Sequence, residues 1–187
     1  MEIQASIPRS SGLRLKDKVA LVTGATRGIG EEIAYHYAAQ GAKVVVSGRD
    51  AGRGARVVEN IKAAGGEAVF LAADLGMEAD VKRLMEESVH VFGGLHILVN
   101  NAAPTNLIAA SSDKCLADHT TGEFDAIVKA MLYATFWCCK YAVPHLLRAG
   151  GGSIINVSSI ASIRGFACVP AYAASKGGMN ALTRQLA

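Results

Sequence analysis

The sequence lacks any marked excess of charge. Its 187 residues carry a formal net charge of only +3 and no strongly basic block, so the composition does not point to a nucleic-acid partner. No uninterrupted apolar run reaches the roughly eighteen residues needed to span a bilayer. The polar opening segment 1–18 contains no apolar stretch of signal-peptide length. We therefore expect a cytoplasmic protein that binds neither nucleic acid nor membrane.

Cysteine is scarce as well, and its spacing is uninformative. Two of the four cysteines are adjacent within an expected helix, and no C-x-x-C pair occurs; the four are Cys115, Cys138, Cys139 and Cys168. This pattern indicates neither a metal site nor a disulfide framework. We expect reduced, mostly buried thiols. Repeats and low-complexity tracts are also missing, and 51% hydrophobic residues suffice for the core of one domain.

Short apolar runs alternate with amphipathic stretches along most of the chain. Residues 1–15 are expected to form a flexible arm, and residues 16–187 a single domain. Strands are predicted at 19–23, 43–48, 67–74, 96–101 and 153–157. Continuous apolar strands that alternate with helices are typical of a parallel sheet covered on both faces. The sequence therefore predicts an α/β protein with a doubly wound parallel sheet, the Rossmann fold.

The segment 102–121 interrupts this alternation. It contains Pro104 and a Ser-Ser-Asp run, so we predict a long loop at the carboxyl end of the fourth strand. Ligands of open α/β sheets lie at such strand ends, and the loop either lines a pocket or is a surface insertion. Residues 124–147 are apolar and aromatic, which predicts a buried helix with Met131 as core filler.

A glycine-rich turn lies between the first predicted strand and the first helix. It reads Thr23-Gly24-Ala-Thr-Arg-Gly28-Ile-Gly30. Backbone N–H groups and a helix N-terminus at this place can receive a pyrophosphate. Gly24 and Gly28 would permit the turn and the close approach of phosphate, and Gly30 would let helix and strand pack. A purely structural turn is the alternative, but the first βα junction favours nucleotide binding.

Three polar residues near the end of the chain have spacings suited to hydride transfer. Ser159 follows the fifth strand, whereas Tyr172 and Lys176 are four residues apart in a predicted helix and so share one face. A carbonyl that receives hydride also needs a proton, and a nearby ammonium would favour the phenolate, so Tyr172 could act as acid or base. Taken alone, Y-x-x-x-K is more often a pair of amphipathic helix residues.

From about residue 16 to its last residue, the chain resembles the short-chain dehydrogenase/reductase family. The motifs that carry the resemblance are TGATRGIG, Asp74-Leu75, Asn100-Asn101-Ala102-Ala103, Ser159, Tyr172 and Lys176. The resemblance implies an oxidoreductase that transfers hydride between NAD(P)(H) and a small-molecule alcohol or ketone. It implies catalytic roles for Ser159 as donor to the substrate oxygen, Tyr172 as acid or base, and Lys176 as tuner and ribose ligand.

The same resemblance assigns the residues that bind the cofactor. The glycine turn would hold the pyrophosphate, Asp74 and Leu75 would contact adenine, and the Asn-Asn-Ala segment would support the sheet beside the cofactor. The full set of expected cofactor-binding residues is Thr23, Gly24, Thr26, Arg27, Gly28, Ile29, Gly30, Arg49, Asp74, Leu75, Asn101, Ala102, Tyr172 and Lys176.

The choice between NADP and NAD depends on the end of the second strand. NAD-binding relatives carry an acid there that accepts hydrogen bonds from the ribose and would repel the 2′-phosphate of NADP. Here no acid appears before Asp50, and the guanidinium groups of Arg27 and Arg49 could clamp a phosphate. We favour NADP(H). NAD stays an alternative because Asp50 could reach a ribose from a tighter turn, and both arginines could simply be solvated.

Three departures from the family pattern bear on activity. Ala103 replaces a glycine, and Met131 falls where relatives usually carry an asparagine that holds a water in the proton relay. Relatives also continue beyond the point that corresponds to Ala187, so we expect a truncated domain without the last strands and, for a full-length protein, a homo-oligomer. The alternative function is a catalytically impaired nucleotide-binding or interaction fragment. A methyltransferase is disfavoured because it gives Tyr172 and Lys176 no role.

Overall fold

The computed structural model describes residues 12–111, 114, 116–165 and 167–187. Within these residues the strands form one sheet with the order β3-β2-β1-β4-β5, and every neighbouring pair is parallel. The strands are β1 (Val19–Thr23), β2 (Lys43–Gly48), β3 (Glu67–Ala72), β4 (Ile97–Asn100) and β5 (Ser153–Asn156). The direction of the strand order reverses at β1, which confirms the predicted doubly wound parallel sheet.

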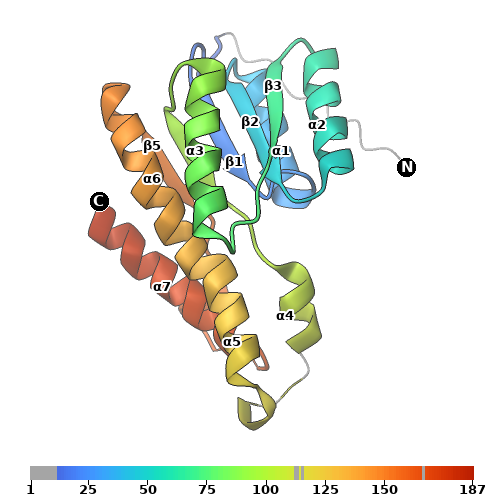
Figure 1. Cartoon of the computed structure of the whole chain (residues 1–187), viewed down its shortest axis with the longest axis vertical. Helices are drawn as coiled ribbons and strands as arrows, with labels where there is room; N and C mark the ends of the chain where they lie inside the picture. Colours follow the sequence, from blue (N-terminus) through green and yellow to red (C-terminus); the bar gives the residue numbers. More distant parts are fainter. Residues whose placement is uncertain (1–11, 112–113, 115, 166) are drawn as a thin grey trace.

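Helices cover both faces of the sheet (Figure 1). One face packs against α1 (Gly28–Ala39) and α2 (Ala51–Ala63), and the other against α3 (Glu78–Phe92) and α6 (Ala134–Arg148). The last helix, α7 (Pro170–Leu186), follows β5 and packs against α5 (Thr121–Val128) and the short 3-10 helix η3 (Ile160–Ser162). The result is a three-layer α/β/α domain.

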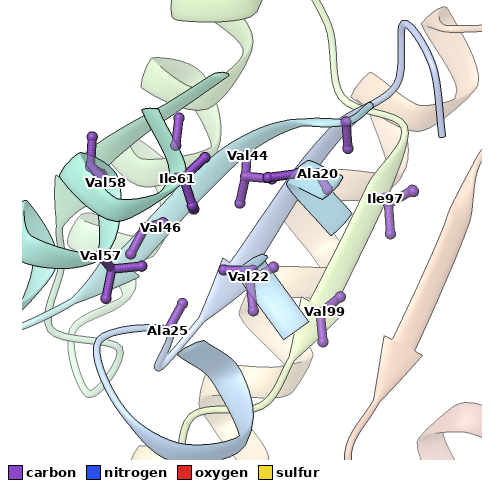
Figure 2. Packing of buried hydrophobic residues seen from close by; sticks show 14 residues of the cluster. Ala20, Val22, Ala25, Val44, Val46, Val57, Val58, Ile61, Ile97 and Val99 are labelled. Atoms are coloured by element: carbon purple, nitrogen blue, oxygen red, sulfur yellow. The ribbon is translucent and has the colours of Figure 1, made fainter. Parts of the chain in front are cut away.

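The core is made by strand side chains that alternate between the two faces. Ala20, Val22, Val44, Val46 and Val99 point to the side of α1 and α2, where Figure 2 shows them with Val57, Val58 and Ile61. The intervening residues Leu21, Val45 and Leu98 point to α3 and α6. Because β1, β2 and β4 are buried on both faces, these strands read as continuous apolar runs in the sequence.

The predicted loop 102–121 contains regular structure, so that prediction was wrong in part. It holds α4 (Thr105–Ser111) and the 3-10 helix η1 (Leu116–Asp118). Proline and polar residues favour a loop, but α4 begins directly after Pro104, where a proline does not disturb a helix. Ile108 then packs beside the buried pair Ile127 and Met131, which holds the short helix against the domain. Cys115 lies outside the described residues.

The predicted helix 124–147 begins earlier and contains an irregular stretch. It runs from α5 through the π-helical segment η2 (Lys129–Tyr133) into α6. Its start is set by a capping box in which the Thr120 hydroxyl accepts from the backbone N–H of Glu123 and the Glu123 carboxylate accepts from that of Thr120. Lys114 pairs with the same carboxylate, and these contacts lower the pKa of Glu123 to about 2.

The continuous helix Thr121–Arg148 is long and apolar enough to cross a membrane, and it is the one candidate among the residues that the structure describes. Length and composition alone are weak evidence, because core helices meet the same test. In its most apolar window, 39% of the residues are buried inside the fold. The sequence shows no uninterrupted run here because Lys129 and Lys140 divide the apolar residues.

The predicted arm, residues 1–15, overlaps the packed structure at its last residue. Residues 1–11 of the predicted arm lie outside the described part of the chain. The backbone N–H of Leu15 donates to the carbonyl of Gln40 at 2.9 Å, and the Leu15 side chain packs against the core. Leu15 therefore belongs to the packed structure.

Candidate functional site

A cavity of about 400 Å³ opens at the carboxyl ends of β1 to β4. Its walls come from the glycine turn after β1, the end of β2, the segment after β3 and the segment after β4. The strand order reverses here, which is where ligands of open α/β sheets bind. Among the predicted cofactor residues, those that line this cavity are Gly24, Thr26, Arg27, Gly28, Ile29, Arg49, Asp74, Leu75, Asn101 and Ala102.

The glycine turn is tightly packed on one side and open on the other. Gly24 has φ +64°, and a Cβ there would lie 2.7 Å from the Cα of Ala102. A Cβ on Gly30 would lie 2.4 Å from both the Gly24 carbonyl oxygen and the Asn101 amide nitrogen. Gly28 has φ +58°, and a Cβ there would have no neighbouring atom within 4 Å. The turn therefore rests against the segment after β4 and leaves space at Gly28 for a ligand.

Thr23 and Asn101 hold the turn from behind. The buried Thr23 hydroxyl accepts from the backbone N–H groups of Asn101 at 3.0 Å and Ala102 at 3.2 Å. It donates to the carbonyl of Val99 at 3.1 Å. The Asn101 side-chain amide donates to the carbonyls of Thr23 and Gly24. Thr23 and Gly30 do not line the cavity, so the structure places both as supports of the turn.

Three arginines line the cavity: Arg27 lies in the glycine turn, and Arg49 and Arg53 flank the start of α2. The guanidinium of Arg27 donates to the Thr105 hydroxyl, which ties the glycine turn to α4. Arg53 pairs with Asp50 at 2.9 Å, and the second carboxylate oxygen of Asp50 caps α2 by accepting from the Arg53 backbone N–H. Arg49 is exposed at the cavity wall, with no hydrogen-bond or ion-pair partner in the described part of the chain. One unpaired guanidinium therefore faces the cavity.

Sequence reasoning missed Arg53 as a wall residue of this cavity. The available signal was its position three residues after Asp50, at the spacing of a helix cap and the first turn. Both oxygens of that carboxylate are occupied by Arg53, once through the guanidinium and once through the backbone. Asp50 therefore lines the cavity as a pair with Arg53, whose guanidinium offsets the charge of the carboxylate.

Ser159 lies where β5 passes into η3. It is the N-cap of η3, and its hydroxyl oxygen accepts from the backbone N–H of Ala161 at 3.2 Å. A hydroxyl that accepts in this way keeps its proton for another acceptor. The neighbouring Ser158 hydroxyl oxygen is inaccessible and lacks a partner among the described residues. This contrast supports the choice of Ser159 over Ser158 as the donor to a substrate.

Tyr172 and Lys176 lie one turn apart near the start of α7. The Lys176 Nζ lies 5.8 Å from the centroid of the Tyr172 ring and donates to the carbonyl of Val157, just after β5. Lys176 is only 3% exposed, and this burial lowers the pKa of its ammonium group. Lys176 thus joins the helix that carries Tyr172 to the strand end that carries Ser159. These three residues do not line the cavity described above.

Met131 lies beside Tyr172, at the centre of the π-helical segment η2. Its side chain is 1% exposed and belongs to a small cluster with Ile127 and Ala171, against which Tyr172 packs. The Met131 carbonyl accepts from the Thr135 hydroxyl at 2.9 Å. A thioether cannot donate a hydrogen bond, so the side chain at position 131 supplies no donor next to Tyr172. Neighbouring Ala130 lines the cavity, which places η2 between the cavity and α7.

Known proteins that are similar to this chain in sequence include dehydrogenases. The chain is 39% identical over 174 residues to a 3beta-hydroxysteroid dehydrogenase of Mediterraneibacter gnavus, which covers 93% of this chain and 61% of that protein. A 7alpha-hydroxysteroid dehydrogenase of Clostridium sardiniense is 37% identical, with 93% and 65% covered. The chain therefore spans slightly less than two thirds of the length of these relatives.

A solved structure and a family model extend the comparison. The crystal structure of a metagenomic short-chain oxidoreductase in complex with NADP has a TM-score of 0.86 and 35% identity, with 92% of this chain and 76% of that chain covered. Residues 18–187 match the model of the short chain dehydrogenase family. The chain therefore belongs to the short-chain dehydrogenase/reductase family.

Proposed function

We propose that this chain provides the cofactor site and the Ser-Tyr-Lys site of an NADP(H)-dependent oxidoreductase that interconverts an alcohol and a ketone. The observation that carries the proposal is the attachment of α7 to the end of β5. Lys176 donates to Val157, two residues before Ser159, and Tyr172 lies one turn from Lys176. A hydroxyl, a phenol and an ammonium are thereby brought to one end of the sheet, beside a cavity suited to a nucleotide.

Each of the three side chains has a chemical role in this proposal. The nicotinamide supplies or accepts the hydride when it is bound. Ser159 donates a hydrogen bond to the substrate oxygen, and Tyr172 transfers the proton to or from that oxygen. The Lys176 ammonium uses one of its three donors on Val157 and has two left for ribose hydroxyls. Its Nζ lies 5.8 Å from the centroid of the Tyr172 ring.

The end of β2 supports NADP(H) over NAD(H). Asp50 also lines the cavity, but each of its oxygens already accepts from Arg53, which makes it a weaker partner for a ribose. A Cβ on Gly48 would lie 2.7 Å from the Thr26 methyl, which leaves no room for an acidic side chain at the strand end. Arg49 remains as an unpaired cation for the 2′-phosphate of NADP.

A second candidate is a nucleotide-binding piece of the same family with little or no turnover. The observation that favours it is the buried thioether of Met131 against Tyr172, because this position supplies no hydrogen bond for a proton relay. The two candidates differ in one measurable respect. Both predict NADPH binding, but only the first predicts NADPH consumption with a ketone.

For the whole protein we also propose a homo-oligomer. Large apolar side chains on the outer helix α6, such as Phe136 at 46% and Leu147 at 71% exposure, support association. Sedimentation of the full-length protein tests this, and a monomer at micromolar concentration would contradict it.

The test of the first candidate is NADPH oxidation with a panel of ketones, in the wild type and in Tyr172→Phe. This substitution keeps the ring and removes the proton, so activity should fall by a factor of about 10² or more, while the Kd for NADPH stays unchanged. Tyr133→Phe is the matched control, because Tyr133 is 52% exposed and packs against Trp137 instead. Full activity in Tyr172→Phe would refute the role, and NADPH binding without turnover in the wild type would favour the second candidate.

A further inference from the structure

A second polar side chain of α7 reaches the segment that carries Ser159. The Asn180 side-chain amide donates to the Ser162 hydroxyl oxygen at 2.7 Å. The Ser162 hydroxyl donates in turn to the carbonyl oxygen of Ser159 at 2.5 Å. Tyr172, Lys176 and Asn180 follow each other at intervals of four residues, so they share one face of the helix. This face therefore contacts the Ser159 segment at more than one point.

The two contacts of α7 bracket Ser159. Lys176 holds the carbonyl of Val157 on the strand side, and Asn180 holds Ser162 on the far side. Between them the backbone forms only the three-residue 3-10 helix η3, a type of helix with weaker hydrogen-bond geometry than an α-helix. The Ser159 carbonyl accepts both the backbone N–H of Ser162 at 3.0 Å and the Ser162 hydroxyl. Side-chain hydrogen bonds therefore supplement the backbone hydrogen bond at the Ser159 carbonyl.

We propose that Asn180 and Ser162 are positioning residues that set the orientation of Ser159 toward a substrate carbonyl. This inference rests on the proposed oxidoreductase function. A serine hydroxyl has a single proton. Because the Asn180 amide donates to the Ser162 oxygen, the Ser162 proton is directed to the Ser159 carbonyl. The Asn180 amide on α7 thus sets the direction of both hydrogen bonds, from Asn180 to Ser162 and from Ser162 to Ser159.

Reversing that donor gives a sharp test. In Asn180→Asp a carboxylate replaces the amide and accepts the Ser162 proton, so the Ser159 carbonyl loses its side-chain donor. Asparagine and aspartate side chains have nearly the same size. Displacement of a reacting group by about 1 Å can cost a hundredfold in rate. We expect a partial displacement, and hence a fall in kcat on the order of tenfold, with the Kd for NADPH unchanged.

Two further variants separate positioning from general support of the fold. Ser162→Ala should lower kcat to the same extent, and Ser162→Thr, which keeps the hydroxyl, should restore it. Thr183→Ala is the matched control, because Thr183 accepts from Asn156 at 2.8 Å and so also joins α7 to β5, but without reaching Ser159. It should leave kcat unchanged. Thermal melting of each variant shows whether folding is retained.

The decisive measurement is the double variant Ser162→Ala with Asn180→Asp. If Asn180 acts through Ser162, the double variant has the same kcat as either single variant, because residues of one network are not additive. Additive losses would overturn the proposal, as would a kcat in Asn180→Asp equal to that of the wild type.

Hydrogen exchange of a backbone N–H tests this inference independently of the proposed function. The backbone N–H of Ser162 donates to the Ser159 carbonyl, so Asn180→Asp should speed its exchange if the hydrogen-bond chain holds the segment. If the wild type shows no reductase activity, the proposed function fails on that result alone. Unchanged exchange at Ser162 in Asn180→Asp would instead overturn the hydrogen-bond chain, whatever the activity.

Discussion

The glycine turn between β1 and α1 and the η3 segment between β5 and α7 both follow a strand, but they are held in different ways. The turn needs small residues, because a Cβ at Gly24 or Gly30 would meet main-chain atoms, and the Asn101 amide adds hydrogen bonds to its carbonyls. The η3 segment is fixed by side chains of α7, through Lys176 and Asn180. Both segments therefore depend on side-chain donors, but only the turn, on the proposed cofactor side, also depends on the absence of side chains.

The strands that carry these two segments differ as well. β1 lies in the middle of the sheet, with Leu21 and Val22 fully buried. β5 lies at the sheet edge in the described structure, and Ile155 is 41% exposed. Burial of apolar area is the main source of stability. Within the described residues, substitutions in β1 should therefore affect folding more than substitutions in β5.

The largest effect on folding is expected in the central strands. Leu98→Ala, in the fully buried part of β4, should lower the free energy of unfolding by about 2 to 5 kcal/mol. Ile155→Ala, in its paired neighbour β5, should cost less than this range because that side chain is 41% exposed. Urea unfolding of both variants measures the difference. Equal losses would show that β5 is as well buried as β4.

A smaller effect is expected within the glycine turn, where two positions can be compared. Gly30→Ala should destabilise the fold by about 3 kcal/mol, the upper end for overpacking, because the neighbouring atoms include the Gly24 carbonyl. Gly28→Ala should cost only about 1 to 2 kcal/mol, since its penalty is the positive φ and the space around it is open. Thermal melting and NADPH titration distinguish the two. If Gly28→Ala were the more damaging for folding, backbone packing would not be what fixes the turn.

The preference for NADPH should depend on Arg49. Arg49→Ala should weaken NADPH binding by on the order of tenfold, as for the loss of one charge-assisted contact, and leave NADH binding unchanged. Arg184→Ala is the control, because Arg184 is an exposed arginine on α7 in the other half of the molecule. Fluorescence titration with both cofactors provides the affinities. Equal affinities for NADPH and NADH in the wild type would refute the preference.

The smallest effect is a pH dependence at the amino-terminal edge of the sheet. The backbone N–H of Val19 donates to Nδ1 of His96 at 3.1 Å, which requires a ring nitrogen without a proton. Burial, with a contribution from nearby Lys18, lowers the pKa of His96. The unfolded chain therefore binds this proton more readily, so stability is fully present above about pH 6.5 and decreases as the pH falls below it.

The variant His96→Gln isolates this contribution, because glutamine can accept the same hydrogen bond without titrating. Urea unfolding at about pH 7 and about pH 5 should show a smaller loss of stability in the variant than in the wild type. Some dependence should persist, because burial also lowers the pKa of His145 on α6. An identical pH dependence in both proteins would mean that His96 does not contribute.

Much of the cofactor side could be predicted because its signals are local. The apolar runs of β1, β2 and β4 and the glycines at Gly24 and Gly30 stand in one stretch of sequence each, and the structure confirms the resulting parallel sheet. The pairing of Tyr172 with Lys176 was also readable from their four-residue spacing on a helix. Which residues of the site contact the cofactor or the substrate stays a prediction.

The rest depended on contacts between distant segments. The helix α4 was missed because its packing on Ile127 and Met131 outweighs the turn signals around Pro104. Local spacing could have suggested Arg53, but only the folded chain shows that it faces the cavity.

The sequence by itself determined the strand pattern, the glycine turn and the helical spacing of the catalytic candidates, because each follows from residues close together in the chain. The tertiary structure alone decided that Lys176 reaches Val157 and that Asn180 reaches Ser162. Those hydrogen bonds join α7 to the segment around η3, and their partners are chosen by how the helix packs in three dimensions. Sequence spacing cannot specify which backbone carbonyl or hydroxyl a helix side chain will meet, because that depends on the packing of the whole domain.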